Sequence, residues 1–367
     1  IDGVKLLNVA NLVDGKIDLS TSDRYISEKE AYGKYKHFLC DAGDFIIASS
    51  GIKVEYIDKK MGFVDESMLP LCMNTSTIRF KVLDEKQLRI RYFMYYLKSE
   101  HFKQQLFKQI TGSAQLNYGP SHLKKMIMPL IDLNDQDEIV SYMDKVQNII
   151  EKRQQELYRL DDLIKARFVE MFGDPVSNSY GLPEATLPEL GEFGRGISKH
   201  RPRNDPKLLG GDYPLIQTGD VANAGLYITS YNSTYSEFGL KQSKMWEKGT
   251  LCITIAANIA KTAILTFDAC FPDSVVGFTS NEKTNNIFIH YWFLFFQAIL
   301  ESQAPESAQK NINLKILSEL RVIVPEKEKQ DEFVDFIHQV DKSKVVVQKS
   351  LDETQMLFDS LMQKYFG

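Results

Sequence analysis

The chain carries one ordered set of short motifs twice. The first set is S-A-Q-L-N at 113–117, Q-D-E at 136–138 and F-G at 172–173. The same order returns 194 residues later, where S-A-Q-K-N begins at Ser307 and the sequence ends in F-G. A repeat on this scale predicts two copies of one structural unit. The fold is therefore expected to have an approximate internal twofold symmetry.

Each copy ends in a long amphipathic pattern. Asn134 can serve as a helix N-cap, and Gly173 followed by Pro175 is a stop signal, so one helix is expected between them. Alternating steps of four and three residues join Ile139, Met143, Val146, Ile150, Arg153, Leu157, Leu160, Ile164, Arg167 and Met171. In the second copy the same steps join Phe333, Ile337, Val340, Lys344, Val347, Leu351, Thr354, Phe358, Leu361 and Tyr365. These are coiled-coil seams, and we predict that the two helices pack antiparallel against each other. The alternative is that each helix packs only on its own domain.

Two paired helices of this length would serve as a spacer. A helix of about 36 residues spans roughly 54 Å. At roughly 3.4 Å per base pair, that length corresponds to at most about 16 base pairs of duplex. A pseudo-symmetric chain suits a partner with two similar half-sites, so duplex DNA is the obvious candidate.

A globular unit precedes each helix. In the first, short β-rich segments are expected at 5–12, 44–48 and 77–83, with one helix over 88–110. The second unit runs from about Leu187 to Pro325. Its residues 215–221 match 6–12 in pattern, and 248–251 match 42–45. The stretch 187–212 has no counterpart ahead of Ile1, so the first unit is expected to be truncated at its start.

The predicted fold class is α/β (α+β), with two similar globular domains separated by two long helices that pair as an antiparallel coiled coil. The predicted divisions are a first domain at 1–131, a central helical spacer at 132–174, a second domain at 175–325 and a C-terminal helical spacer at 326–367.

Composition limits the class of protein. The 367 residues are 43% hydrophobic and 25% charged, which is ordinary for a globular protein, and no signal peptide or membrane span is evident. Cys40, Cys72, Cys252 and Cys270 form no C-x-x-C pair, so we expect buried free thiols and a cytoplasmic location. The net charge of −5 argues against a uniformly basic surface, so any contact with phosphates must use local clusters of positive charge.

The duplicated order of S-A-Q-x-N, an apolar strand, a proline, Q-D-E and a helix ending in F-G resembles the specificity subunit of type I restriction-modification systems. The resemblance covers essentially the whole chain apart from the expected missing start. It implies that each globular unit is a target recognition domain that reads one half of a split DNA sequence. It also implies that the helices set the distance between the half-sites and dock two modification (methyltransferase) subunits. In such systems a restriction subunit adds ATP-driven translocation and cleavage.

No catalytic or metal-binding motif emerges. The sequence contains no N-P-P-Y or D-P-P-Y run and no phosphate-binding loop of the G-x-x-x-x-G-K-[ST] type. Asp273, Glu282 and Lys283 are spaced wrongly for adjacent metal ligands, and Gly194-Arg195-Gly196 fits a plain turn. We therefore expect no catalytic residue, no metal and no cofactor on this chain. By the resemblance, S-adenosylmethionine, ATP and Mg are expected on the partner subunits.

The second unit offers the densest set of candidate DNA contacts. Arg and Lys neutralise phosphates, and Arg, Lys, Asn and Gln read base edges. The strongest candidates lie in one stretch that Gly and Pro mark as an exposed loop: Lys199, His200, Arg201, Arg203 and Lys207. Further candidates are Gln217, Thr218, Asn258 and Lys261. The alternative for the loop is an ordinary solvated surface.

The first unit offers fewer candidates. Basic and aromatic residues alternate at Arg24-Tyr25 and around Lys34 and Lys36, as in a loop that lines a groove. Lys53 is the last residue of the segment 49–53, which corresponds to 256–261. The repeated polar residues are Gln115, Asn117, Gln309 and Asn311. These four fit either DNA contact or a polar joint between domain and helix. Because the two units differ almost everywhere else, a bipartite, non-palindromic target is expected.

Two other functions are compatible with the sequence. The chain could be a coiled-coil scaffold that holds two protein partners without reading DNA. It could also be a self-sufficient nuclease or methyltransferase, which the absent motifs disfavour. Charge reversal at Arg201, Arg203 and Lys261 distinguishes the scaffold from DNA recognition, because a scaffold does not need these charges.

Overall fold

The computed structural model describes residues 3–21, 23–110, 116–303 and 312–367. Its contacts separate two compact units. Unit 1 comprises Ile1–Gln155 and Gln348–Gly367, and unit 2 comprises Glu156–Val347. Each unit thus contains one globular part and portions of both long helices. The four-part division of the chain stays a prediction.

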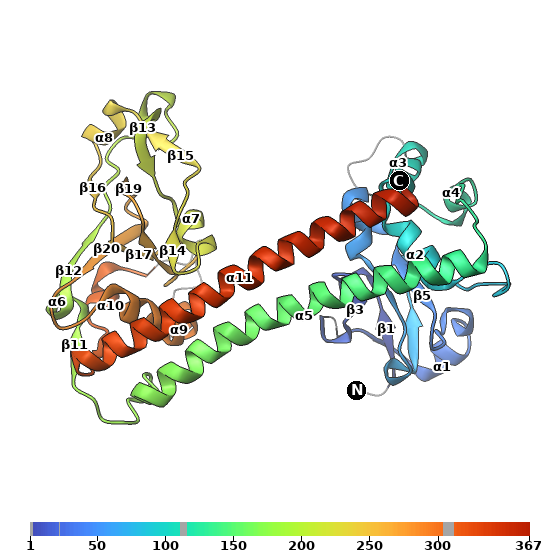
Figure 1. Cartoon of the computed structure of the whole chain (residues 1–367), viewed down its shortest axis with the longest axis horizontal. Coiled ribbons are helices and arrows are strands. Elements are labelled where there is room, and N and C mark those ends of the chain that lie inside the picture. The colour runs from blue at the N-terminus through green and yellow to red at the C-terminus, as the bar shows by residue number, and fades with distance from the viewer. Residues whose placement is uncertain (1–2, 22, 111–115, 304–311) are drawn as a thin grey trace. The chain divides into compact units, whose positions relative to one another are not determined.

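The two predicted long helices are present and unbroken (Figure 1). They are α5 (Leu133–Phe172) and α11 (Lys327–Phe366). Every predicted seam position on both helices is buried or half-buried, whereas Glu156, Lys349 and other positions between the seams are exposed. The alternating steps of four and three therefore identified the packed face of each helix correctly.

Within unit 2 the helices pack antiparallel. Near one end of the contact, Phe333 of α11 packs against Phe168 with ring centroids 5.4 Å apart, and Arg167 pairs with Glu332 at 3.1 Å. Farther along, Lys344 pairs with Asp161 at 2.5 Å. Residue numbers rise on α11 as they fall on α5, which defines the antiparallel direction. The seam cations Arg167 and Lys344 thus each meet a carboxylate of the other helix.

Within unit 1 a third helix joins the pair. Tyr95 of α2 (Ile90–Lys98) donates its hydroxyl hydrogen bond to Asp144 of α5 at 2.6 Å, and its ring lies 6.3 Å from that of Phe358 of α11. Tyr92 packs against Phe366 at 5.1 Å. Met143 of α5 belongs to the same buried cluster. Each helix therefore packs on its globular domain as well as on the other helix, so the predicted antiparallel pairing is confirmed and packing on the domain alone is wrong.

Unit 1 contains two three-stranded sheets. One has the order β7-β5-β9, formed by Met61–Phe63, Phe45–Ala48 and Thr77–Phe80. The other has the order β4-β1-β8, formed by Tyr25–Ile26, Val4–Leu7 and Leu71–Met73. Two-stranded pairs join β2 (Leu12–Val13) with β3 (Lys16–Ile17) and β6 (Ser50–Ile52) with β10 (Leu116–Asn117). The short helices are α1 (Glu28–Tyr32), α3 (Glu100–Gln109) and α4 (Pro120–Leu123).

Unit 2 contains larger sheets. The five-stranded sheet has the order β12-β20-β17-β18-β14, formed by Gly191–Arg195, Val275–Ser280, Leu251–Thr254, Thr262–Leu265 and Tyr227–Ile228. The four-stranded sheet has the order β15-β13-β19-β16, formed by Ser233–Tyr235, Leu209–Leu215, Ala269–Cys270 and Met245–Trp246. β11 (Glu184–Thr186) pairs with β21 (Arg321–Ile323). The helices are α6 (Leu187–Leu190), α7 (Thr218–Asn223), α8 (Glu237–Lys241), α9 (Asn286–Gln303) and α10 (Leu314–Ser318).

The two units repeat one topology. In unit 1, β5 lies between β7 and β9; in unit 2, β17 lies between β18 and β20. β1 pairs parallel with β8, as β13 does with β19. A capped turn follows both β1 and β13. After β1, Asn8 N–H donates to the Asn11 side chain at 3.0 Å; after β13, Gln217 N–H donates to the Asp220 side chain at 2.8 Å. The sequence match between 6–12 and 215–221 is therefore a structural equivalence.

Three predicted segments differ from the structure. The helix expected over 88–110 is two helices, α2 and α3, because Ser99 ends the first through its N–H and caps the second through its hydroxyl, which accepts from Phe102 N–H. The strand expected over 5–12 ends at Leu7, where Asn8 begins the capped turn. The strand expected over 77–83 ends at Phe80. Side-chain capping explains the first two differences, and the third arises because the pairing of β9 with β5 ends at Phe80.

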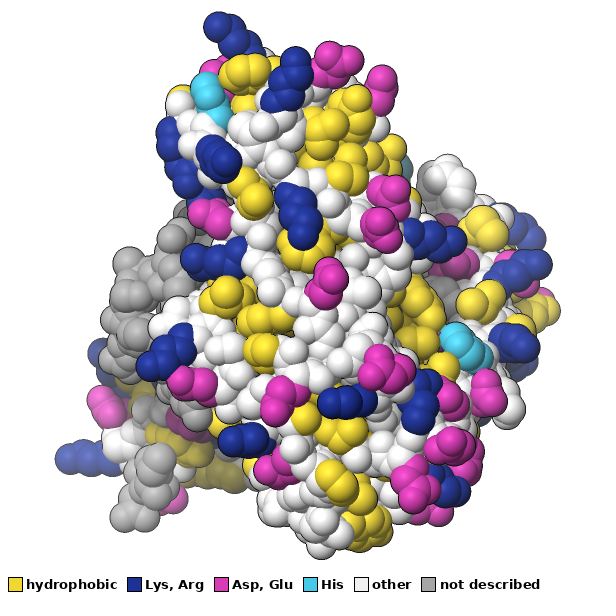
Figure 2. Space-filling model, turned by 90° about the vertical axis from the view of Figure 1, so that its left-hand side faces the viewer, with side chains coloured by type: hydrophobic (Ala, Val, Ile, Leu, Met, Phe, Trp, Pro, Cys, Tyr) yellow, Lys and Arg dark blue, Asp and Glu magenta, His cyan; other side chains and the backbone are white. Residues whose placement is uncertain are grey.

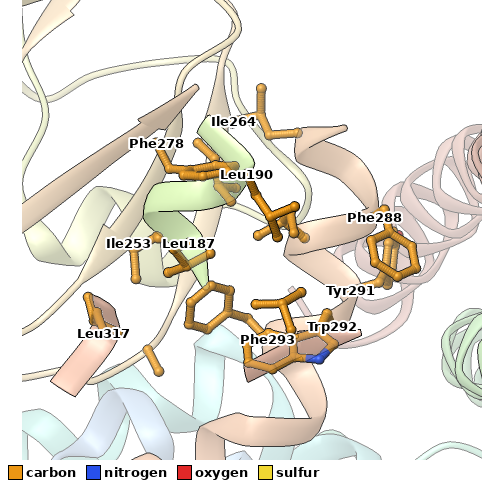
Figure 3. Packing of buried hydrophobic residues seen from close by; sticks show 14 of the residues in the cluster. Leu187, Leu190, Ile253, Ile264, Phe278, Phe288, Tyr291, Trp292, Phe293 and Leu317 are labelled. Carbon is orange, nitrogen blue, oxygen red and sulfur yellow. The ribbon is translucent and has the colours of Figure 1, made fainter. Parts of the chain in front are cut away.

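The core of unit 2 gathers around α9. Figure 3 shows Trp292 and Phe293 of α9 facing Leu187 and Leu190 of α6. These four side chains are fully buried.

All four cysteines of the chain are also buried, as predicted, and burial raises the pKa of the Cys40 thiol to about 12.

The first residue of the first Q-D-E motif has a structural role. Gln136 on α5 is fully buried, and its side-chain amide donates to the carbonyl oxygens of Gln87 (2.8 Å) and Ile131 (2.9 Å). Its side-chain oxygen accepts from Arg89 N–H at 2.8 Å. A single glutamine therefore satisfies three groups that would otherwise lack partners where α5 meets its domain.

Gln330 makes the same joint in unit 2. Its amide donates to the carbonyl oxygens of Lys283 (3.0 Å) and Pro325 (2.9 Å), and its oxygen accepts from the Thr284 hydroxyl at 2.9 Å. Gln330 is also fully buried. The repetition of this motif is explained by anchoring of the helix to the domain.

We predict that Gln330→Ala lowers the free energy of unfolding of unit 2 by about 2–4 kcal/mol, because it leaves buried polar groups without hydrogen bonds. Both tryptophans of the chain, Trp246 and Trp292, lie in unit 2, so tryptophan fluorescence during urea unfolding reports on this unit. The control is Gln339→Ala, at an exposed position of α11, which should change stability by about 0.5 kcal/mol or less. Equal effects of the two substitutions would contradict the anchoring role.

Candidate nucleic-acid interface

The predicted basic loop of unit 2 is exposed. It connects β12 to the 3-10 helix Pro206–Leu208, and Lys199, Arg201, Arg203 and Lys207 are all exposed while His200 is half-buried. The loop begins at Gly196, where an added Cβ would lie 2.3 Å from Phe271 O and 2.4 Å from Pro272 O. Only glycine permits this close approach of two backbones. The approach fixes the start of the loop against the segment before β20.

One acidic residue holds two of the loop arginines. Arg203 pairs with Asp273 at 2.5 Å, and Arg201 lies 3.8 Å from the other oxygen of the same carboxylate. Arg201 also donates to the carbonyl oxygens of Ser198 (2.6 Å) and His200 (2.8 Å). Sequence reasoning did not identify Asp273 as the partner, because 70 residues separate it from Arg203. The carboxylate partly neutralises the two guanidinium groups, whose remaining N–H donors are open to another anion because both side chains are exposed.

A second acid orders the middle of the loop. His200 lies 2.8 Å from Asp205 through its ring nitrogen Nε2. The pKa of Asp205 is lowered, first by the backbone N–H of Lys207 and then by His200. Lys199 and Lys207 make no ion pair with any residue that the structure describes. These two cations are therefore available for contact with an anionic partner.

The hairpin between β17 and β18 presents Asn258 and Lys261. The Thr254 hydroxyl donates to Asn258 O and accepts from Lys261 N–H at 3.0 Å. Ala257 and Ala260 have positive φ angles of 64° and 56°, a region that alanine seldom adopts. The hairpin is therefore tightly constrained, with the Asn258 side chain exposed and Lys261 half-buried. A constrained loop of this kind suits the precise placement of a base-reading amide.

The basic loop and the hairpin lie at the same end of unit 2. Ile255 N–H at the start of the hairpin donates to Ser274 O at 3.0 Å, and Ser274 follows Asp273, which holds Arg203. Gln217 is exposed and Thr218 half-buried where β13 leads into α7, which contacts β17 and β18. The structure thus brings the loop and the hairpin together, while no hydrogen bond or ion pair joins Gln217 to either of them within the described residues.

Positive charge gathers over the smaller sheet of unit 2. Figure 2 shows Lys and Arg side chains around the upper part of one face, where Figure 1 labels α8 and β13. Lys241 and Lys244 are at least partly exposed in this part, and the ammonium group of Lys244 lies 3.7 Å from the centroid of the Trp246 ring. Acidic side chains are interspersed on the same face. The net charge of −5 is therefore compatible with a local basic surface.

In unit 1 four candidates lie around the sheet β4-β1-β8. Arg24 and Tyr25, at strand β4, are exposed, as are Lys34 and Lys36, which follow α1. The ammonium of Lys34 lies 4.9 Å from the centroid of the Tyr35 ring. Helix α1 packs on this sheet through Ala31, so the two predicted pairs belong to one substructure. No side-chain hydrogen bond or ion pair joins one pair to the other within the described part of unit 1.

Lys53 and Asn117 lie at the two-stranded pair of β6 and β10 in unit 1. Both are exposed, and Asn117 of β10 pairs with Ser50 of β6. Ser49 O accepts from Tyr118 N–H, as Ile255 O accepts from Ile312 N–H in unit 2, each at 3.0 Å. The predicted correspondence between residues 49–53 and 256–261 is thus supported. Gln115, Gln309 and Asn311 lie outside the described residues.

The described residues hold no group of three or more His, Cys, Asp or Glu that could bind a metal ion. His290 on α9 is buried beside Thr262 at 2.9 Å, and burial lowers its pKa to about 4. None of the described helices has the length and apolar character needed to cross a membrane.

The sequence matches a known family of DNA-specificity domains. The family described as type I restriction modification DNA specificity domain matches residues 8–159 and 184–353. These two matches cover most of the chain, so the protein belongs to this family and carries its domain twice. The doubled domain gives the chain a role in DNA sequence specificity.

Individual relatives are distant in sequence. A putative type I restriction enzyme MjaX specificity subunit of Methanocaldococcus jannaschii is 21% identical over 341 residues, covering 89% of this chain and 78% of that protein. The MjaVIII specificity subunit of the same organism is 26% identical over 164 residues, covering 44% of this chain and 37% of that protein.

Two solved structures share the fold. A chain from a study of complex assembly and conformational transition of the type I R-M system matches with a TM-score of 0.60 and 16% identity, over 98% of this chain and 90% of that one. The S subunit of a type I system from M. genitalium matches with a TM-score of 0.53 and 16% identity, over 100% of this chain and 89% of that one. At this level of identity the likeness concerns the fold alone.

We predict that Asp273→Asn tightens binding of random-sequence duplex DNA by about two- to fivefold, because it removes a negative charge beside Arg201 and Arg203. Fluorescence anisotropy at low salt measures the affinity. Glu282→Gln is the control, because it removes one negative charge of unit 2 that makes no ion pair within the described residues. Weaker binding by Asp273→Asn would show that this carboxylate supports the loop rather than competing with phosphate.

Proposed function

We propose that this chain is the DNA-specificity subunit of a type I restriction-modification complex, in which each unit reads one half of a bipartite target. The observation that carries the proposal is that a basic loop and a constrained hairpin lie together at one end of unit 2. The family domain to which they belong occurs twice in the chain. The cations contact phosphates and position the unit. The amides and remaining cations read base edges.

The two half-sites should differ in sequence. Unit 2 presents Asn258 and Lys261 from a short hairpin, whereas unit 1 has Lys53 and the 3-10 helix Val54–Lys59 between its corresponding strands. Recognition loops that carry different side chains form different hydrogen-bond patterns with bases. The target is therefore asymmetric, and it is non-palindromic.

The helices are proposed to set the spacing and to dock two modification subunits. Large apolar side chains remain exposed along α5 and α11, among them Tyr158 (72%), Val345 (68%) and Val346 (68%) in unit 2 and Met356 (64%) in unit 1. Exposed apolar residues in such numbers on a helix pair indicate a protein-binding surface. The same surface would serve a scaffold without DNA readout, so only the DNA-binding experiments separate the two functions.

Methyl transfer is assigned to the partner subunits. On this proposal the modification subunits bind S-adenosylmethionine, and restriction subunits, where they are part of the complex, use ATP and Mg. This chain binds none of these cofactors and contributes the choice of sequence. A cytoplasmic location follows from a function on cellular DNA.

We predict that replacing Arg201, Arg203 and Lys261 together by alanine weakens DNA binding and lowers the slope of log affinity against log salt by about 2–3, at roughly 0.9 per lost phosphate contact. Fluorescence anisotropy across a salt series measures both quantities. The matched control replaces Lys315, Lys327 and Lys329, which lie on helices α10 and α11 rather than on the basic loop or the hairpin. An unchanged slope in the first variant would favour the scaffold.

We also predict that the chain alone transfers no methyl group, whereas its complex with modification subunits methylates adenine at one split sequence. Methylome sequencing of the host with and without the gene measures the effect. The methylated motif should disappear on deletion and return on complementation. An unchanged pattern of N6-methyladenine would refute the proposed function, and methyl transfer by the isolated chain would support the self-sufficient enzyme instead.

A further inference from the structure

A 3-10 helix in unit 1 occupies the place that the constrained hairpin occupies in unit 2. In unit 1, Ala48 N–H at the end of β5 donates to Lys60 O at 2.8 Å. In unit 2, Thr254 N–H at the end of β17 donates to Lys261 O at 2.9 Å. The two connections therefore start and end at equivalent places. The one in unit 1 is longer because it contains the 3-10 helix Val54–Lys59.

This helix has three distinct faces. Side chains three residues apart lie above one another, because a 3-10 helix has three residues per turn. Tyr56 N–H donates to Lys53 O at 3.1 Å, as this geometry requires. Burial follows the same period of three, so each face meets a different environment.

The inward face anchors the helix to unit 1. Ile57 is fully buried in the core cluster of the unit, and Val54 is half-buried against the same cluster. Lys60 continues this face and donates a hydrogen bond from its ammonium group to Leu12 O at 2.7 Å. These contacts fix the direction in which the other two faces point.

The acids of the helix lie on a second face. They are Glu55 and Asp58. Asp58 is half-buried and lies 3.5 Å from the ammonium group of Lys103 on α3, so its charge is balanced within unit 1. Glu55 is exposed in the first turn of the helix. The remaining face therefore carries no negative charge.

The third face carries an aromatic ring between two cations. Lys53, Tyr56 and Lys59 are all exposed, and the exposed fraction of Tyr56 is 49%. The ammonium group of Lys59 lies 6.0 Å from the centroid of the Tyr56 ring. Neither lysine forms an ion pair with any residue that the structure describes. Tyr56 belongs to none of the apolar clusters formed by the described residues, so packing does not explain this tyrosine.

The separation of the two lysines fits the major groove of DNA. From Lys53 to Lys59, a rise of about 2.0 Å per residue gives a separation of roughly 12 Å along the helix. The major groove is about 12 Å wide and lies between the phosphates of the two strands, whereas the minor groove is only about 6 Å wide. Cations at this separation reach phosphates on both sides of the major groove. The ring between them then faces the edges of the bases.

We propose that Lys53 and Lys59 bind phosphates on the two sides of the major groove and that Tyr56 reads a thymine there. The methyl group of thymine is the apolar group that bases present in this groove, and the phenol ring gives it an apolar surface to pack on. The Tyr56 hydroxyl donates or accepts a hydrogen bond at a base edge. Tyr56 is thus a specificity-determining residue of unit 1. The inference rests on the proposed function and deepens it, because it names the groove and the residue that reads it.

The test separates base reading from phosphate binding. Tyr56→Ala should reduce the preference for the target over a duplex with the read A·T pair changed to G·C by roughly tenfold, with an unchanged salt slope. Lys59→Ala should lower the slope of log affinity against log salt by about 0.9 and keep the preference. Fluorescence anisotropy of the full chain measures both quantities, with duplexes in which each A·T pair of the methylated motif is replaced in turn.

Lys86→Ala is the matched control for the lysine. Lys86 is exposed, and it follows Phe80 at the end of β9 that lies away from Ala48 and the 3-10 helix. Both the salt slope and the preference should therefore stay unchanged. A slope for Lys59→Ala equal to that of this control would contradict the contact with phosphate.

Methylome sequencing identifies the base that is read. In a host that carries Tyr56→Ala in place of the original gene, one A·T position in one half of the motif should become degenerate. The other half should stay as it was, because unit 2 is unaltered.

Three results would overturn the inference. The first is an unchanged motif and preference for Tyr56→Ala, while the triple alanine variant of unit 2 weakens binding; the proposed function would then stand without this residue. The second is a lower salt slope for Tyr56→Ala, which would mean contact with the DNA backbone. The third is a shifted midpoint of urea unfolding, which would mean a role in the fold. If neither unit's variants alter binding, the proposed function itself fails.

Discussion

The pairing of α5 with α11 is the interaction on which the rest of the structure depends. Neither globular part is closed without it, because Phe168 and Phe333 complete the core of unit 2, and Met143 and Phe366 complete that of unit 1. The helices are attached to their domains by Gln136 and Gln330, each buried with its hydrogen-bonding groups satisfied. Within each unit, a rigid joint of this kind fixes the position of the helices relative to the globular part that carries the candidate DNA-binding loops.

Duplication gives the chain two units with the same arrangement of strands but with different surface loops. The ladders around β5 and β17, the parallel pairs β1 with β8 and β13 with β19, and the capped turns at Asn8 and Gln217 are common to both. What differs lies on loops, where a change of side chain costs little stability. Sequence recognition can therefore vary while the frame that presents it stays constant.

Much of the fold followed from periodicity, and the errors have local causes. The seams of both helices were predicted position by position, because a seven-residue repeat sustained over many turns keeps its apolar side chains on one face of a helix. The single helix expected over 88–110 was wrong because Ser99 both ends one helix and caps the next. The basic loop around Arg201 was predicted from its composition, but its partner Asp273 was not. Contacts between segments far apart in sequence leave no periodic signal.

The sequence by itself determined the duplication, the helical seams, the buried cysteines and the exposed basic loop. Each depends on the order and chemistry of neighbouring residues, which set hydrophobic periodicity and turn formation. Only the tertiary structure decided that Asp273 holds two arginines, that Thr254 constrains the hairpin of Asn258, and that the 3-10 helix Val54–Lys59 turns a tyrosine outward between two lysines. These features arise from the alignment of strands across the sheet, and that register is a property of the packed chain.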